Sequence, residues 1–213
     1  MSSAKSEYSL AELKERMDDY GIGSVLQDWL YRSSEFHTYS APGLLIGVFM
    51  IDYAMELLGA DPREKLYTVC ETHKCAPDAV QVVAHCTFGN NRLRIIPTGR
   101  FALTLNRSSA EETTEAVRVY IDPKKLERFP IIFTWFTKSP DFDKKTMARQ
   151  LTDQILGARR EILSWERVRV PVRRKKEWKS ATCPVCGEHV PEHLLEEWVC
   201  ASCGSLHYYE KAT

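Results

Sequence analysis

The sequence predicts an α+β fold, with N-terminal helices packed on a mainly antiparallel sheet, followed by a small cysteine-rich module. Helical patterns fill the chain up to Gly59, and most strand patterns come after it. Two CxxC pairs stand within the last 31 residues. Helices first and strands later are typical of an α+β domain.

The first two helices are expected from their capping residues. Ser9 and Glu12 form a capping box, in which a hydroxyl and a carboxylate satisfy free N–H groups, and Gly21 ends that helix. Ser24 and Gln27 repeat the pattern at the start of a second helix. Apolar residues at helical spacing follow each cap: Leu10, Leu13, Met17, Val25, Leu26, Trp29 and Leu30.

A third helix is expected from Pro42 to Leu58. Proline suits the first turn of a helix, and Gly59 ends this one. The segment is apolar on nearly every face, which predicts the central core helix. Gly43 and Gly47 lie four residues apart on one side, where another backbone can approach closely.

The rest of the chain is expected to contain strands and two more helices. Pro97-Thr98-Gly99 predicts a hairpin between strands Arg92–Ile96 and Arg100–Leu105. Val168, Val170 and Val172 alternate with arginines, which predicts a strand with one basic face. The other expected elements are strands Leu66–Cys70 and Ala116–Ile121 and helices Pro77–His85 and Asp143–Leu163.

The composition indicates a globular protein without net charge. The 213 residues include 29 Lys and Arg against 29 Asp and Glu, so no basic field steers the whole chain onto nucleic acid. The N-terminus has no apolar signal-peptide run, and the apolar stretch Ser40–Ile51 is too short to span a membrane. We expect a cytoplasmic protein with reduced thiols.

The last cysteines have the spacing of a metal site. Cys183, Cys186, Cys200 and Cys203 form a C-x2-C-x13-C-x2-C pattern, whose two turns complete a tetrahedral four-sulfur shell for zinc. A redox CxxC is the alternative for one pair, but two matched pairs favour zinc. Because a closed shell leaves no position for substrate, we expect a structural zinc in a zinc-ribbon or treble-clef-like module that folds only with its metal.

Charge changes sign along this end of the chain. Residues 161–180 carry seven basic and three acidic side chains, whereas residues 181–213 carry one basic and five acidic. An acidic zinc module repels phosphate, so nucleic-acid binding is disfavoured, and the basic run is expected to be a solvated linker or a docking surface. The expected division is a core domain over 1–165, a basic strand and linker over 166–180, and the zinc module over 181–213.

Reactive side chains are dense between residues 71 and 93. At 100° per residue, one helix face carries Cys75, Asp78, Gln81, His85 and Cys86. Cys75 stands at the helix start, where the dipole favours a thiolate, and hence a metal ligand or a nucleophile. Cys86 lies too far along a continuous helix to share one metal with Cys75, and Cys70 is expected to be inert core. The alternative is an ordinary solvated polar face.

These residues carry a family resemblance. The segment ETHKCAPDAVQVVAHCTFGNNRL resembles the pattern E-x-x-x-C-x-x-D-A-[IV]-Q-x-x-x-x-C-T-x-G-x-x-x-L of the FmdE family, which is named after a subunit of formylmethanofuran dehydrogenase. Upstream, FHTYSAPGLLIG is similar to the family's F-H-G-H-x-C-P-G-x-x-x-G. The resemblance covers Glu35 to Leu93. It implies an α+β core that dimerises, a metal-binding groove, and an association with molybdenum or tungsten formylmethanofuran dehydrogenase, which handles one-carbon units.

Two positions depart from that pattern. Tyr39 stands where the family has its second histidine, and Ala41 stands where it has a cysteine. A metal site that uses either residue loses ligands here, which makes an altered or lost activity an alternative. The groove residues that the resemblance implies are His37, Cys75, Asp78 and Gln81, with Cys86 and Tyr39 as further candidates. It also implies a second metal, held in the core by His37 and Cys75.

We therefore expect an FmdE-like protein that binds a metal, or a small one-carbon or pterin-like ligand, and serves a molybdenum or tungsten enzyme. The alternative is a non-enzymatic interaction or regulatory protein that docks through its zinc module and basic stretch. A homodimer through the core is expected, because Pro42–Leu58 is more apolar than one small sheet can cover. The competing expectation is a monomer in which Asp143–Leu163 covers that helix.

Overall fold

The computed structural model describes residues 7–174, 177–210 and 212, and the chain divides into two units, which meet between Val172 and Arg173. The expected core boundary at residue 165 falls inside a strand of the first unit. Residues 175 and 176 of the expected basic linker lie outside the described residues.

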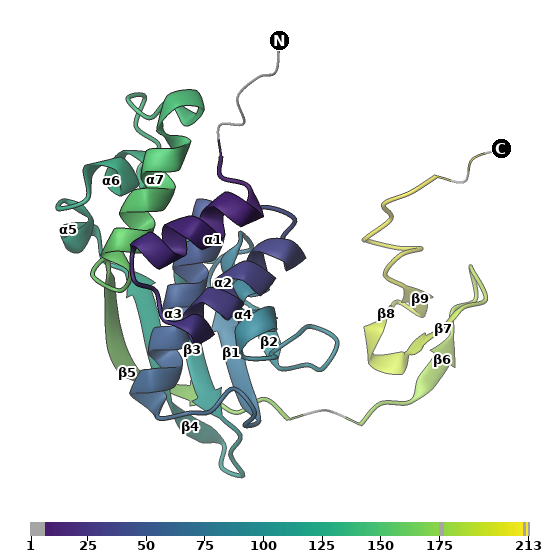
Figure 1. Ribbon diagram of the computed structural model, residues 1–213. Helices are drawn as coiled ribbons and strands as arrows, with labels where there is room; N and C mark the ends of the chain where they lie inside the picture. Colours follow the sequence, from purple (N-terminus) through teal and green to yellow (C-terminus); the bar gives the residue numbers. More distant parts are fainter. Residues whose placement is uncertain (1–6, 175–176, 211, 213) are drawn as a thin grey trace. The chain divides into compact units, whose positions relative to one another are not determined.

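The first unit combines helices with one five-stranded sheet (Figure 1). Its helices are α1 (Leu10–Asp19), α2 (Ser24–Phe36), α3 (Pro42–Leu58), α4 (Ala76–Val83), α5 (Pro123–Leu126), α6 (Pro130–Phe136) and α7 (Lys144–Ala158). Its strands are β1 (Leu66–Cys70), β2 (Leu93–Ile95), β3 (Ala102–Arg107), β4 (Thr113–Ile121) and β5 (Leu163–Pro171). The α+β class is therefore confirmed.

The sheet has the strand order β2-β1-β3-β4-β5, and every pair is antiparallel except β1 with β2. The expected hairpin across Pro97-Thr98-Gly99 is wrong. The strand before this turn pairs in parallel with β1, and β1 lies between β2 and β3. Turn residues alone cannot tell a hairpin from a loop that passes over a neighbouring strand.

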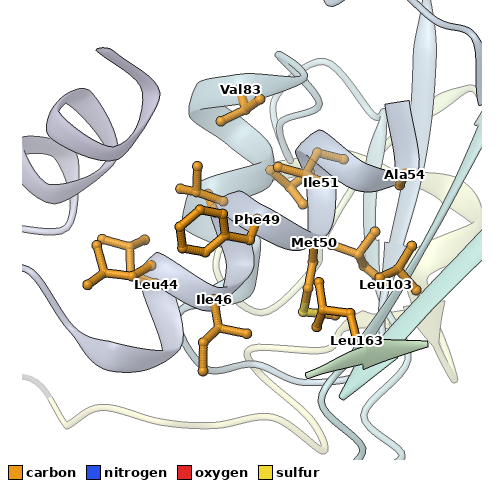
Figure 2. Packing of buried hydrophobic residues seen from close by; sticks show 14 of the residues in the cluster. Leu44, Ile46, Phe49, Met50, Ile51, Ala54, Val83, Leu103 and Leu163 are labelled. Carbon is orange, nitrogen blue, oxygen red and sulfur yellow. The ribbon is translucent and has the colours of Figure 1, made fainter. Parts of the chain in front are cut away.

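Helix α3 forms the centre of the core, as its sequence indicates. Its residues from Gly43 to Ile51 are all buried, and Gly59 ends it in the left-handed conformation. Met50 points toward Leu103 and Leu163 of the sheet, and Phe49 extends the same buried cluster on another side of the helix (Figure 2). The chain's own elements thus bury this helix, so its apolar character gives no argument for a second copy.

The two glycines of α3 allow α4 to approach closely. A Cβ atom on Gly47 would lie 3.1 Å from both Ala76 Cα and Ala79 Cβ. A Cβ on Gly43 would lie 3.3 Å from the Cβ and Sγ atoms of Cys75. The expected backbone approach is confirmed, and it fixes where Cys75 lies.

Several expected helix ends need correction. The N-cap of α2 is Gly23, and the Gln27 amide instead donates to Asp18 and to the Ile22 carbonyl, so the second capping box is absent. The helix expected from Asp143 to Leu163 ends at Ala158, where the chain turns into β5. The capping box of Ser9 and Glu12 is confirmed.

The second unit is built from two short hairpins. β6 (Ser180–Thr182) pairs with β7 (His189–Pro191), and β8 (Leu195–Glu196) pairs with β9 (Val199–Cys200). A single 3-10 turn, Glu192–Leu194, joins the two hairpins. In the described part of the chain, no helix is long and apolar enough to cross a bilayer.

Candidate functional site

A hydrogen-bonded pair of side chains joins two helices of the first unit. His37 caps the C-terminus of α2, and Asp78 lies in the first turn of α4. The Nδ1 atom of His37 donates to Asp78 Oδ2 at 2.6 Å, and the Gln81 amide donates to Asp78 Oδ1 at 3.3 Å. Since the carboxylate accepts at Nδ1, the Nε2 atom of a neutral imidazole carries its free lone pair.

That Nε2 atom has no described partner. The atom is buried and makes no hydrogen bond, and only 16% of the His37 side chain is exposed. The Tyr39 ring lies 4.9 Å from the imidazole, between ring centroids. Ala41, the other departure from the family pattern, is buried and offers no ligand atom. An oriented but unpaired ring nitrogen is the usual arrangement of a metal-binding histidine with its carboxylate partner.

Cys75 immediately precedes α4 in an unusual backbone conformation. Its φ is 52° and its ψ is −54°, and the Ala76 N–H donates to the Lys74 carbonyl at 2.5 Å. The expected helix-start thiolate needs correction. Burial raises the pKa of the Cys75 thiol, and the Asp78 carboxylate raises it further, whereas Lys74 and Lys138 act in the opposite direction.

The other reactive side chains between residues 71 and 93 do not lie together. Helix α4 ends at Val83, and His85 has a φ of 52°, so the chain leaves the helix before both His85 and Cys86. The Cys86 thiol is buried and donates to the Leu66 carbonyl at 3.2 Å, while His85 is exposed. The expected shared helix face is therefore wrong at its C-terminal end. Burial also raises the pKa of Cys70 to about 12.

A buried ion-pair network anchors the loop that leads to Cys75. Glu71 directly follows β1, and its carboxylate accepts from Arg118 at 2.5 and 3.1 Å and from Thr98 at 3.1 Å. Arg100 forms a further ion pair with Glu71 at 2.7 Å. Sequence reasoning missed this network, because Arg118 lies on β4 and no local pattern connects it to Glu71.

A shallow groove of about 550 Å³ lies beside this site, between α2 and α4. Gln81 connects the groove to the Asp78–His37 pair through its hydrogen bond. Apolar side chains around α2 and the loop after α4 are exposed, including Val25, Phe36 and Phe88. The lining residues of the groove are Arg32, Glu35, Phe36, Gln81, Val82, His85 and Thr87.

The four C-terminal cysteines come together. The Sγ atoms of Cys183, Cys186, Cys200 and Cys203 all lie within 4.8 Å of one another. Over residues 7–174, 177–210 and 212, no second group of three or more metal-ligating side chains is this close. Neither His37 nor Cys75 therefore belongs to a ready-made group of three ligands.

The four sulfurs are too crowded to be charged all together without a cation. Hydrogen bonds from the backbone N–H groups of Cys200 and Cys186 lower the pKa of Cys183 to about 6. The hydrogen bond between the Cys203 and Cys200 thiols raises the pKa of Cys203 to about 12, since crowded sulfurs oppose further ionisation. Four thiolates therefore coexist here only when a metal ion neutralises them.

An α+β core with an oriented histidine and a separate four-cysteine module defines a class of small two-unit metal-binding proteins. The family described as "FmdE, Molybdenum formylmethanofuran dehydrogenase operon" matches residues 36–170. The chain belongs to this FmdE family.

Two relatives extend the comparison. The chain is similar to a protein from Syntrophus aciditrophicus, known from a crystal structure and described as like FmdE of tungsten formylmethanofuran dehydrogenase. The TM-score is 0.71 at 31% identity, over 98% of this chain and 100% of that one. The present chain is also 27% identical to a probable S-adenosyl-L-methionine-binding protein from Archaeoglobus fulgidus. That match covers 87% of this chain but only 55% of the relative, so this chain spans about half of its length.

Proposed function

We propose that this protein is a metal-binding accessory of a molybdenum or tungsten formylmethanofuran dehydrogenase, with one structural zinc in its tail and a second metal in its core. The observation that carries the core site is the His37 imidazole, which Asp78 fixes at 2.6 Å and whose Nε2 atom is buried without a partner. The membership in the FmdE family supports the association with the dehydrogenase.

The core donors fit a borderline-soft divalent metal. An imidazole nitrogen from His37 and a sulfur from Cys75 are ligands that zinc accepts, and Tyr39 offers a phenol oxygen nearby. With Ala41 in place of a cysteine, the protein leaves positions open on such an ion. A bound metal supplies a Lewis acid that can take a small one-carbon or pterin-like ligand. Asp78 and Gln81 hold the imidazole in its orientation.

Zinc is the metal that the tail geometry favours. Tetrahedral zinc with Zn–S bonds of about 2.3 Å places its sulfurs about 3.8 Å apart. The Sγ atoms of Cys186 and Cys200 lie 3.8 Å apart. Since four thiolates fill the shell, this zinc has a structural role.

Metal analysis of full-length variants tests both sites. The zinc-loaded, dialysed protein is expected to hold two equivalents of metal. His37→Ala should retain one, and Asp78→Asn should bind the core metal 10- to 100-fold more weakly. Cys200→Ser should lose the tail zinc while the core still unfolds cooperatively.

His85→Ala is the matched control, since it removes an exposed histidine close to the same helix. It should retain both metals. Two equivalents in the His37→Ala protein would refute the core site, and full zinc retention in Cys200→Ser would refute the tail site.

We also propose a homodimer through the core unit. The support is that Val25 and Phe36 of α2 and Phe88 after α4 are large apolar side chains left exposed. A second copy of the chain would remove such side chains from water.

A further inference from the structure

The second unit presents a tryptophan at the tip of a tight hairpin. Strands β8 and β9 are joined by two residues, Glu197 and Trp198, which lie between the paired Glu196 and Val199. Their φ angles are 48° and 73°. A two-residue turn with two positive φ angles normally has Asn or Gly at these positions, because larger residues are strained there.

The indole of Trp198 is 81% exposed. A tryptophan is on average highly buried in a folded protein, so this exposure does not serve the unit's own packing. Further large apolar side chains of the same unit are exposed: Val185, Leu194, Leu206 and Tyr208. Exposed apolar area on this scale marks a contact surface for another molecule.

The base of the hairpin is held at several points. Cys200 ends β9 and is one of the four clustered cysteines, and its carbonyl accepts from the Gly204 N–H at 3.1 Å. The Glu196 carboxylate accepts from the Ser205 hydroxyl at 2.6 Å. A fixed hairpin presents its indole with little loss of conformational freedom on binding.

The charge around the indole selects the chemistry of the partner. Glu196 and Glu197 directly precede Trp198 in the hairpin, and residues 181–213 carry five acidic side chains against one basic. The other basic residues of this unit, such as Arg173 and Lys179, come before its first hairpin. Phosphate groups of nucleic acid or of an anionic membrane are therefore disfavoured at the β8–β9 hairpin itself. A protein surface with Lys and Arg residues around an apolar pocket is complementary to both the charge and the indole.

We propose that the β8–β9 hairpin is a protein-docking element in which Trp198 fills an apolar pocket that a basic rim surrounds. This docking role is independent of the core metal. In this proposal Glu196 and Glu197 attract and orient the basic partner, and the indole of Trp198 supplies most of the binding free energy.

The test uses the full-length, zinc-loaded chain as bait for a display library of random 12-residue peptides. The selected peptides should carry net positive charge together with apolar residues. Their affinity should fall at least about tenfold in Trp198→Ala, because a central aromatic anchor dominates binding. Glu197→Lys and added salt should also weaken binding.

Trp178→Ala is the matched control, because it removes another exposed tryptophan of the same unit, outside the hairpin. It should bind within about twofold of the parent chain. Zinc content shows that each variant keeps its fold. The proposal is overturned if no peptide is enriched, if the selected peptides are acidic or neutral, or if they bind Trp198→Ala equally. A 20-base-pair DNA duplex whose binding depends on Trp198 would also overturn it.

Discussion

At the residue scale, single side chains are held by partners far away in the sequence. Glu71 after β1 pairs with Arg118 of β4 across β3, and His37 at the end of α2 bonds to Asp78 at the start of α4. In both cases the hydrogen-bonding partner offsets the free-energy cost of burying a charged or polar group. The loop from Glu71 to Cys75 is fixed at one end by this ion pair and at the other by the contact of Cys75 with α3.

The Glu71 ion pair predicts a pH dependence of stability. Burial alone would raise the pKa of Glu71, but the hydrogen bonds and charge of Arg118 lower it overall. A carboxyl whose pKa is lower in the folded state stabilises fully above its unfolded pKa, which is about 4.3. That contribution is lost as the pH falls through the folded pKa.

Glu71→Gln should therefore cost about 3 kcal/mol of unfolding free energy at pH 7, and the cost should shrink below about pH 4. Urea unfolding at pH 7 and pH 3.5 measures both values. Glu166→Gln is the control, because it removes the exposed partner of the same arginine and should cost about 1 kcal/mol or less. A cost of Glu71→Gln that stays constant across this pH range would contradict the assignment.

At the element scale, the close approach of α3 and α4 positions the candidate site. Helix α4 lies against Gly43 and Gly47, which places Cys75 and Asp78 beside the end of α2. Any side chain at these glycines pushes α4 outward. The helix pair is thus both a packing unit and the scaffold of the site.

Gly47→Ala should destabilise the core by about 1–3 kcal/mol, because the new Cβ meets the α4 backbone. This loss should exceed the gain of about 1 kcal/mol that alanine brings to a helix interior. Chemical denaturation measures the difference.

Gly157→Ala in α7 is the matched control. A Cβ there meets only the ring edge of Tyr20 at 3.3 Å, and a side chain can move aside. This variant should be neutral or more stable. Equal stability of Gly47→Ala and the parent chain would show that the two helices do not require this contact.

At the scale of the whole molecule, the two units have separate tasks. The first buries a large helix-centred core and holds the His37–Asp78 pair between two of its helices. The second has little apolar interior and gathers four sulfurs that could hold a metal ion in place of a core. The association of two chains then depends on the apolar side chains that each unit leaves exposed.

The proposed homodimer predicts a mass of about twice 24.5 kDa by light scattering at micromolar concentration. Phe36→Glu combined with Phe88→Glu should give the monomeric mass, because two charges enter the apolar contact. Phe133→Glu, at an exposed position of α6, should leave the dimer intact. A monomeric parent chain would exclude the dimer.

Features that depend on near neighbours could be predicted from the sequence. The capping box of α1, the bounds of α3 and each CxxC pair involve groups that lie within a turn or two of backbone. Only the tertiary structure decided the order of β2, β1 and β3, the exit of the chain from α4 before His85, and the pairing of Glu71 with Arg118. These features depend on which distant segments pack together and exclude water, and local secondary-structure propensity does not predict that packing.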